Sequence, residues 1–345
     1  MAPSLPVADC HNDLLLGVLH QRERGLSDPF GDFWLPQLRA GGVVLQVLPV
    51  FTEEQHVGEG ALRRSLQVLE EARRLADVHA TDVVICQRGD QILPAIQSGR
   101  IALVLALEGC EPIGHSLELL DTFHRLGVRI ASMTWNRRTM MADGVGEQDA
   151  GGRLTKLGLE AVAEMERLGM IVDVSHLSET GFWHLTSVAT RPFVASHSSC
   201  RALQAHPRNL TDEQIRAVAD SGGFVAINGF GPFLSDAATV DSFLAHVSHA
   251  VSLVGAERVA LGLDFMRDLV DAVDPVLGGA LVDSDALPWV EGLERPTDLA
   301  ALAVRLSEVL GPQVSRRVCA GTIVETLARQ LDSEPPGVSM SDRES

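Results

Sequence analysis

Side chains that can bind a metal or carry a proton stand at the ends of several apolar runs in this chain. They close five of these runs: His11 and Asp13, Glu108, His176, His197 and Asp264. In a barrel of parallel strands all strand ends meet on one face, so residues far apart in sequence share one pocket. Three imidazoles, two aspartates and a glutamate gathered there predict a hydrolytic metal site.

The first of these groups is a His-x-Asp unit. On an extended chain, His11 and Asp13 point to the same side, so the imidazole and the carboxylate can bind one cation. Alone, the pair is weak evidence. Its position at the end of the first apolar run is what favours a metal site.

Glu108 follows the apolar run 101–107 directly. A carboxylate buried at the end of such a run needs a cation or a hydrogen-bond donor to offset its lost hydration. Its two oxygens could each bind one metal. The alternative, an N-cap of the next helix, stays equally open from the sequence.

His176 and His197 end two successive runs, 170–176 and 192–197, about one strand–helix repeat apart. Together they are candidates for the ligands of a second cation. Asp173, Ser196 and Ser198 are expected to hold these imidazoles or nearby backbone donors. A serine nucleophile is the weaker interpretation, because the chain has no Gly-x-Ser-x-Gly elbow.

Two further residues suggest how a substrate is processed. Asp264 ends the run 258–264, and a carboxylate there can act as general base and then return the proton to a leaving amine. Arg208 could bind a substrate carboxylate through two parallel hydrogen bonds, or it could be an ordinary surface arginine.

Eight runs are predicted to be strands, and most are continuously apolar, as parallel strands buried on both faces are. They cover residues 5–11, 42–50, 101–107, 128–135, 170–176, 192–197, 223–228 and 258–265. Helical patterns lie between them at 58–80, at 154–169 with Gly169 as a C-cap, and at 210–223 with Thr211 as an N-cap.

This alternation predicts an α/β protein, and eight strands favour a closed (β/α)8 barrel of the TIM type over an open sheet. We expect one domain over residues 1–331. Segments 299–310 and 322–331 are expected to be closing helices, and segment 266–297 an irregular loop over the site. Residues 332–345 are polar, contain proline, and are expected to be a disordered tail.

Composition excludes several functions. The chain has 345 residues and a net charge of -18, which argues against nucleic-acid and anionic-membrane partners. No apolar stretch approaches ~18 residues, and the first residues lack a basic region and a long apolar region. We therefore expect no signal peptide and a cytoplasmic protein.

The five cysteines form no Cys-x-x-Cys pair and are expected to be reduced thiols. Cys10, Cys110 and Cys200 lie near the proposed ligands, where packing is favoured over metal binding. The other nine histidines are interpreted as surface or structural. Among them, His115 and His206 lie nearest the site loops.

From about residue 5 to 330 the chain resembles the membrane (renal) dipeptidase family, peptidase family M19, of the amidohydrolase-like barrels, and it is most similar to the bacterial branch. The matching segments occur in the family's order. They are DCHNDLL, ALEG, GVRIASMTWNRRTMMADG, LTKLGLEAVAEMERLGMIVDVSHLS, PFVASHSSCRAL, HPRNLTDEQIRAVADSGG and LGLDF.

The resemblance implies two zinc ions per subunit, one held by His11, Asp13 and a bridging Glu108, the other by Glu108, His176 and His197. It implies that Asp264 is the acid/base residue and that Arg208 binds the C-terminal carboxylate of the substrate. It further implies a homodimer and attack by a metal-bridging water on dipeptides, with tolerance for L-Xaa-D-Xaa substrates.

Three departures from the family pattern are evident. Cys10 replaces a usual glycine, Met266-Arg267 replaces a usual Asp-Gly, and Trp135 stands where animal members carry a histidine. An indole N–H cannot carry a proton between groups, so zinc itself must stabilise a transition-state oxyanion, with Asn136 or a backbone N–H as a further donor. Trp135 and Asn136 are therefore predicted to contact the substrate.

The sequence thus predicts a zinc-dependent dipeptidase. Two other classes remain open: a pathway-specific amide or dipeptide hydrolase of secondary metabolism on the same barrel, and a non-catalytic binding protein that kept the fold. A substrate panel separates the first alternative from a general dipeptidase, and metal analysis separates the second.

Overall fold

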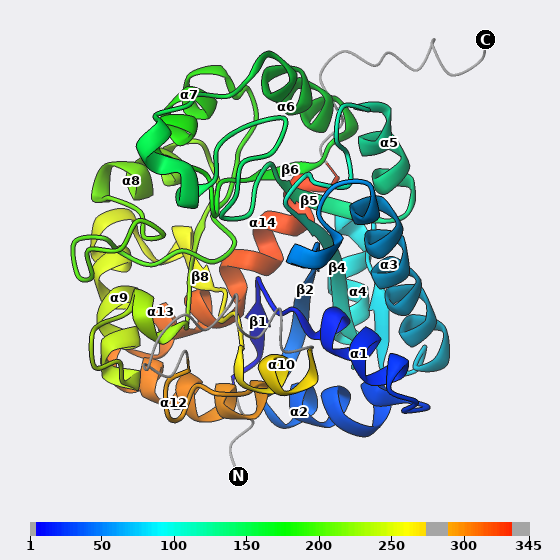
Figure 1. Ribbon diagram of the computed structural model, residues 1–345. Coiled ribbons are helices and arrows are strands. Elements are labelled where there is room, and N and C mark those ends of the chain that lie inside the picture. The colour runs from blue at the N-terminus through cyan, green and yellow to red at the C-terminus, as the bar shows by residue number, and fades with distance from the viewer. Residues whose placement is uncertain (1–4, 274–288, 333–345) are drawn as a thin grey trace.

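Parallel strands occupy the centre of the molecule and helices surround them (Figure 1). The computed structural model describes residues 5–273 and 289–332. Its strands are β1 (Val7–Asp9), β2 (Val43–Phe51), β3 (Val83–Ile85), β4 (Ile101–Glu108), β5 (Val128–Ser132), β6 (Ile171–Asp173), β7 (Val225–Ile227) and β8 (Val259–Leu261).

The strands pair in the order β6-β5-β4-β2-β1-β8-β7. The ring closes between β6 and β7 through the predicted strand 192–197, which makes only two isolated parallel bridges, Asp173 with Val194 and Ala195 with Val225. The predicted (β/α)8 barrel is therefore confirmed, although segment 192–197 is an extended segment of the barrel rather than a regular strand. The additional strand β3 was not predicted, and it pairs with the first residues of β4.

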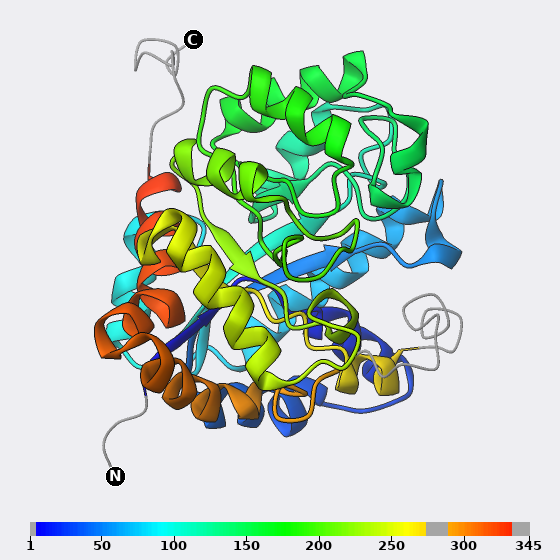
Figure 2. The same cartoon turned by 90° about the vertical axis from the view of Figure 1, so that its left-hand side faces the viewer.

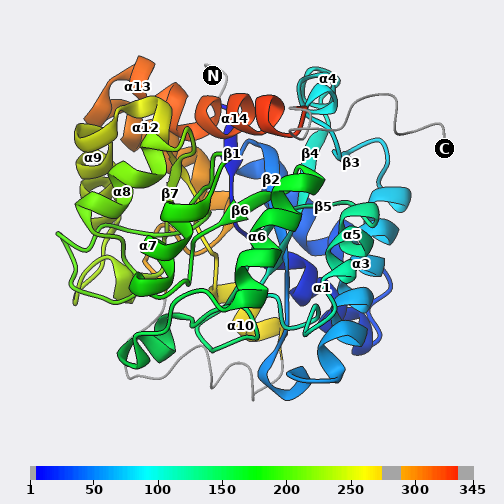
Figure 3. The same ribbon diagram turned by 90° about the horizontal axis from the view of Figure 1, so that it is seen from above.

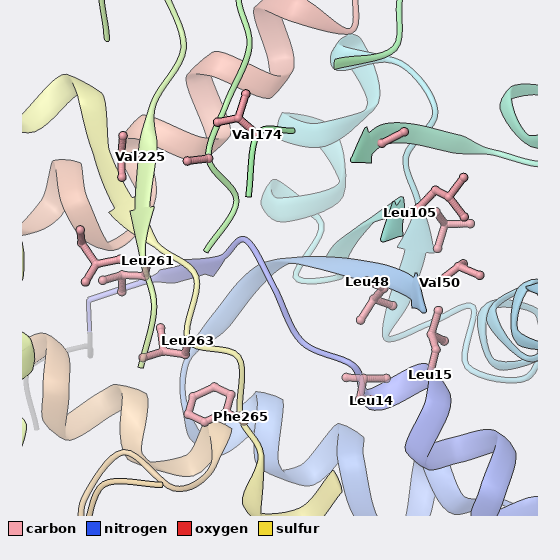
Figure 4. Packing of buried hydrophobic residues seen from close by; sticks show 14 of the residues in the cluster. Leu14, Leu15, Leu48, Val50, Leu105, Val174, Val225, Leu261, Leu263 and Phe265 are labelled. Carbon is pink, nitrogen blue, oxygen red and sulfur yellow. The ribbon is translucent and has the colours of Figure 1, made fainter. Parts of the chain in front are cut away.

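Alternation along the strands sorts the side chains into two layers. On β4, Ala102 and Val104 belong to an inner cluster, whereas Leu103 and Leu105 pack outward under the helices. Figure 4 shows members of the outer layer on several strands, among them Leu48 and Leu105. The same alternation puts Glu108 on the inner side at the end of β4, which aims its carboxylate into the barrel mouth.

The helices form the outer layer of the barrel (Figure 2). They are α1 (Leu14–Glu23), α2 (Leu35–Ala40), α3 (Gly60–Val78), α4 (Ile92–Gln97), α5 (Glu118–Arg125), α6 (Lys156–Leu168), α7 (Glu179–Val188), α8 (Asp212–Asp220), α9 (Val240–Val254), α10 (Arg267–Ala272), α12 (Leu299–Leu310), α13 (Pro312–Arg316) and α14 (Thr322–Gln330).

The predicted helix ends are those observed where a capping residue was recognised. Thr211 caps α8 by accepting a hydrogen bond from the Gln214 backbone N–H, and Gly169 ends α6 in the left-handed conformation with φ of 75°. Helix α6 begins after Thr155, a second side-chain cap, which was not predicted.

Helix α14 and helix α10 lie at opposite ends of the barrel (Figure 3). Ile323 and Leu327 of α14 join the inner cluster and close the amino end of the strands, so the functional end is the one where α10 follows β8. The predicted irregular segment 266–297 thus begins with a helix. Residues 274–288 of that segment, and the predicted tail beyond residue 332, lie outside the described residues.

Candidate active site

The predicted metal-binding side chains converge at the carboxyl ends of the strands. His11 Nε2 lies 3.3 Å from Asp13 Oδ2 and 3.6 Å from Glu108 Oε2. On the other side of the same carboxylate, Glu108 Oε1 lies 2.9 Å from His176 Nε2 and 3.5 Å from His197 Nε2. Glu108 therefore stands between two groups of ligand atoms, and the alternative of a helix N-cap is excluded because the next helix begins only at Glu118.

The donor atoms form two overlapping groups whose members lie within 4.8 Å of one another. One group is His11, Glu108 and His197, and the other is His11, Asp13 and Asp264. His176 joins the first group, since its Nε2 is 2.8 Å from His197 Nε2. Asp264, predicted as the acid/base residue, thus lies as close to the first histidine as a ligand would.

Two buried polar atoms of this cluster lack a hydrogen-bond partner among the described residues. They are Nε2 of His11 and Oδ1 of Asp13. An unpaired buried acceptor or donor is costly, and a bound cation would satisfy both atoms. Imidazole nitrogens together with carboxylate oxygens are a donor set that suits zinc, so the residues present fit the metal that the sequence predicts.

The pKa shifts follow from burial and mutual charge. Burial lowers the pKa of His176 and of His197 well below the usual value, so both rings are neutral, as metal ligands must be. Burial likewise lowers the pKa of His11, but the carboxylates of Glu108 and Asp13 outweigh it and raise that pKa to about 10. The negative field that favours a proton on His11 would equally favour a divalent cation.

Backbone strain is confined to two of the site residues. His176 has φ of 69° and Asp264 has φ of 56°, the only non-glycine residues with positive φ among those described. This left-handed conformation costs on the order of 1 kcal/mol per residue for a side chain with a Cβ. It turns each chain sharply at the end of its strand and carries the imidazole and the carboxylate over the barrel mouth.

A relay of hydrogen bonds holds His197. Its Nδ1 lies 2.7 Å from Ser196 Oγ, which in turn donates to the carboxylate of Asp173. Asp173 also accepts from the backbone N–H of Ser175, whose hydroxyl accepts from the His197 N–H at 3.1 Å. The placement of Asp173 and Ser196 matches the supporting role that the sequence predicts. Ser175 was missed.

Arg208 is buried, so the alternative of a surface arginine is wrong. Its Nη2 donates to the carbonyl of His197 at 2.9 Å and its Nη1 to Ser198 Oγ at 3.0 Å. Its Nε lies 3.0 Å from His176 Nδ1. Burial lowers its pKa to about 10, and the carboxylates of the site oppose that shift, so the side chain is cationic at neutral pH.

Trp135 and Asn136 also reach the cluster. The Trp135 ring centroid is 5.9 Å from that of His176, and the Asn136 Oδ1 is 2.7 Å from His176 Nδ1. The amide oxygen of Asn136 is therefore occupied by the histidine, and its Nδ2 is the group left to meet a substrate. Phe51 packs edge-on against Trp135 at 5.3 Å and was not predicted as a site residue.

Asp264 has a fixed partner that is not among the predicted site residues. The Asn228 side chain donates to its Oδ2 at 3.1 Å. Asn228 ends the predicted strand 223–228, so the pattern that identified the acids and histidines could also have pointed to it. Burial raises the pKa of Asp264, while the charge on His11 opposes the rise.

The remaining candidates lie outside the donor groups. All five cysteines are buried free thiols, and no cysteine belongs to a candidate metal group of the described residues, which fits the packing interpretation. His115 is exposed. His206 stacks on Phe233 at 4.6 Å and accepts a hydrogen bond from the Arg208 backbone N–H, so it supports the loop that carries the arginine.

Within the two described segments, no helix has both the length and the apolar character that spanning a membrane requires.

The sequence profile of a family described as membrane dipeptidase (peptidase family M19) matches residues 1–277. An uncharacterized dipeptidase of Schizosaccharomyces pombe is 33% identical over 286 residues, which cover 75% of this chain and 68% of that protein. The dipeptidase tcpJ of Claviceps purpurea is 30% identical over 241 residues, covering 67% of this chain and 56% of that protein.

Two solved structures share the whole architecture. A metallo peptidase from Rhodobacter sphaeroides, liganded with a phosphinate mimic of the dipeptide L-Ala-D-Ala, superposes with a TM-score of 0.83 at 25% identity over 95% of this chain and 100% of that one. The dipeptidase AC of family M19 gives a TM-score of 0.83 at 26% identity over 96% of this chain and 100% of that one.

Proposed function

Because this chain belongs to the membrane dipeptidase family, peptidase family M19, and is therefore a metallo-dipeptidase, we propose that the clustered side chains at its barrel mouth hold two zinc ions and hydrolyse free dipeptides. The observation that carries the proposal is Glu108, whose two oxygens each face a separate group of imidazole and carboxylate donors.

In this proposal His11, Asp13 and Glu108 hold one ion, and Glu108, His176 and His197 hold the other. The unpaired Nε2 of His11 and Oδ1 of Asp13 support the first of these sets, and the neutral rings of His176 and His197 support the second. Bound zinc supplies an acidified water and a Lewis acid for the peptide carbonyl.

Asp264 holds and moves the proton. Asn228 fixes its Oδ2, which leaves Oδ1 to accept a proton from the attacking water and to return it to the departing amine. The raised pKa of this buried carboxyl suits both steps, because a proton held too weakly would not be retained for the leaving group.

Arg208 binds the free carboxylate of the substrate. A guanidinium has five N–H donors, and the contacts to the His197 carbonyl, Ser198 and His176 use three nitrogens without exhausting them. The guanidinium N–H groups that remain can bind an anion through paired hydrogen bonds, and a C-terminal carboxylate one residue from the scissile bond is such an anion. This arrangement selects substrates whose free carboxylate lies one residue beyond the scissile bond, as it does in a dipeptide.

Trp135 and Asn136 complete the substrate contacts. Trp135 contributes an apolar wall beside His176, and Asn136 offers its Nδ2 to the developing oxyanion. The phosphinate mimic of L-Ala-D-Ala bound by the Rhodobacter sphaeroides relative supports activity on L-Xaa-D-Xaa dipeptides.

We also propose that the enzyme acts in the cytoplasm as a homodimer, with residues 1–331 forming one domain. The net charge of -18 supports a small-molecule substrate and neither a nucleic-acid nor a membrane partner.

Metal analysis combined with a dipeptide panel tests the proposal. The purified protein should contain about two zinc ions per chain and should hydrolyse dipeptides, including L-Xaa-D-Xaa members, but not the corresponding dipeptide amides, which lack the free carboxylate that Arg208 binds. Zinc-loaded protein that leaves every dipeptide intact while cleaving another amide would refute it.

A further inference from the structure

The ring of His176 has two distinct environments. Its Nε2 faces the other donor atoms, at 2.9 Å from Glu108 Oε1 and 2.8 Å from His197 Nε2. Its Nδ1 lies 2.7 Å from Asn136 Oδ1 and 3.0 Å from Arg208 Nε. Only Nε2 is therefore placed to bind a metal, and the two neighbours on the opposite side decide the state of Nδ1.

These two neighbours require opposite states of one nitrogen. The carbonyl oxygen of Asn136 can only accept, so it needs a proton on Nδ1. Arg208 Nε always carries hydrogen and can only donate, so it needs a lone pair on Nδ1. A neutral imidazole with a proton on Nδ1 has its lone pair on Nε2, where a metal can use it. The tautomer that accepts from Arg208 would carry the proton on Nε2 and block that site.

His197 shows the arrangement without such competition. Its Nδ1 lies against a single side-chain oxygen, Ser196 Oγ, which passes its own hydrogen to Asp173. This fixes the Nδ1-protonated tautomer and leaves Nε2 free. At His176 the corresponding oxygen is that of Asn136, and it has to compete with a cationic donor.

The backbone holds Asn136 and His176 together. The Gly146 N–H donates to the Asn136 carbonyl at 2.7 Å, and the Val145 N–H donates to the His176 carbonyl at 2.9 Å. A Cβ on Gly144 would come within 2.0 Å of the Trp135 carbonyl, so only glycine allows this close approach. The loop thereby fixes the distance between the amide and the strained histidine.

We propose that Asn136 is a positioning residue that keeps the proton of His176 on Nδ1, which leaves Nε2 for the metal and releases Arg208 Nε for the substrate carboxylate. This inference rests on the proposed function. It adds that one amide oxygen controls both metal affinity and the availability of the arginine.

The test compares variants by metal affinity before any substrate is added. Zinc affinity is measured by competition with a chromophoric chelator, and tautomers are read from ¹⁵N shifts of the zinc-loaded, histidine-labelled protein. Asn136→Ala and Asn136→Leu should each weaken zinc binding 10- to 100-fold, the usual range for loss of such a partner. Asn136→Asp keeps an acceptor and should stay within about threefold of the parent.

Gln148→Leu is the matched control, because it removes an amide from the neighbouring loop without touching His176, and its zinc affinity should equal that of the parent. Only those Asn136→Ala and Asn136→Leu proteins whose circular dichroism spectrum matches that of the parent are compared. We also expect Asn136→Ala to raise KM for dipeptides, because Arg208 Nε would remain bound to Nδ1 of His176.

Parent-like zinc affinity in a folded Asn136→Ala or Asn136→Leu protein overturns the inference. So does an Asn136→Asp protein that binds zinc as weakly as those two variants. A parent enzyme that binds zinc but cleaves no dipeptide counts against the proposed function alone, because the affinity comparison needs no substrate.

Discussion

The side-chain amide of Asn228 donates to Oδ2 of Asp264 at 3.1 Å, and the same carboxylate lies within 4.8 Å of the donor atoms of His11 and Asp13. One oxygen of Asp264 is thus held by the protein while the group as a whole borders the metal-binding cluster. The fixed oxygen limits how the carboxylate can turn toward a cation, which supports the proposed role of Asp264 as a proton carrier rather than a ligand.

Asp264→Asn tests that distinction. The amide has nearly the same shape but accepts no proton, so the variant should keep its zinc and lose roughly 10²- to 10⁴-fold in kcat. Metal content and kcat are measured on the same preparation. If turnover stays within threefold of the parent, the acid/base role is wrong, and if zinc is lost with activity, Asp264 is a ligand.

Arg208 should contribute mainly to substrate binding. Arg208→Lys keeps the charge but loses the paired N–H donors, and we expect KM for dipeptides to rise roughly 10- to 100-fold with a smaller change in kcat. Arg208→Ala should go further, because it also removes the donors to His197 and Ser198. Initial rates over a range of dipeptide concentrations give both constants. An unchanged KM for Arg208→Lys would exclude paired hydrogen bonds from Arg208 to the substrate carboxylate.

Removal of the metal should affect stability as well as activity. Without a cation, Glu108 and Asp13 repel each other across a buried site and Nε2 of His11 stays unpaired. Chelator-treated protein should therefore lose activity and melt roughly 5 °C or more below the zinc-loaded protein. Zinc should restore both properties, whereas Mg²⁺ should not, since it prefers oxygen ligands. Identical melting curves with and without chelator would contradict this expectation.

A buried ion-pair cluster outside the site should govern acid stability. Burial alone would raise the pKa of Glu53, but hydrogen bonds from His20 at 2.6 Å and Arg64 at 2.6 Å lower it from 4.5 to about 2. Since the folded-state pKa lies below the unfolded one, the carboxylate stabilises the fold above about pH 4.5. That contribution, roughly 3 kcal/mol, is lost as pH falls toward 2.

Glu53→Gln should accordingly lower the free energy of unfolding at pH 6, and the difference from the parent should shrink by pH 3. Urea denaturation of the metal-free proteins at both values measures it. Glu70→Gln, which breaks an exposed pair with Arg73, is the control and should have little effect at either pH. A deficit in Glu53→Gln that persists undiminished at pH 3 would show that the pKa shift is not its cause.

The sequence predicted which acids and histidines gather at one end of the barrel, because each of these residues follows a run that had to be buried. Glu108 illustrates this: a carboxylate after seven apolar residues could only be stable with charged or donating neighbours, and it has three histidines around it. The strand ends themselves were predicted less well: β1, β5, β6 and β8 end two to four residues before the predicted positions. Helix ends were predictable where the residue type identifies a cap, as at Thr211 and Gly169.

What could not be predicted depends on contacts between distant segments. Nothing near Asn136 in the sequence indicates that its oxygen meets His176, forty residues away. The segment 192–197 looked like a regular strand, but it bridges the sheet only at Val194 and Ala195. The contact of Asn136 and the irregular pairing of segment 192–197 both depend on segments far away in the sequence, and the local composition does not reveal them.

The left-handed backbone at His176 and Asp264 sets stability against the proposed metal binding and proton transfer at two positions. Glycine adopts this conformation without steric penalty and asparagine tolerates it, so either would relax the chain there. Laboratory evolution that selects for heat resistance alone should therefore favour glycine or asparagine at these positions. The selected proteins would melt at a higher temperature and would lack turnover. Thermostable variants of this enzyme are best sought with both codons held fixed.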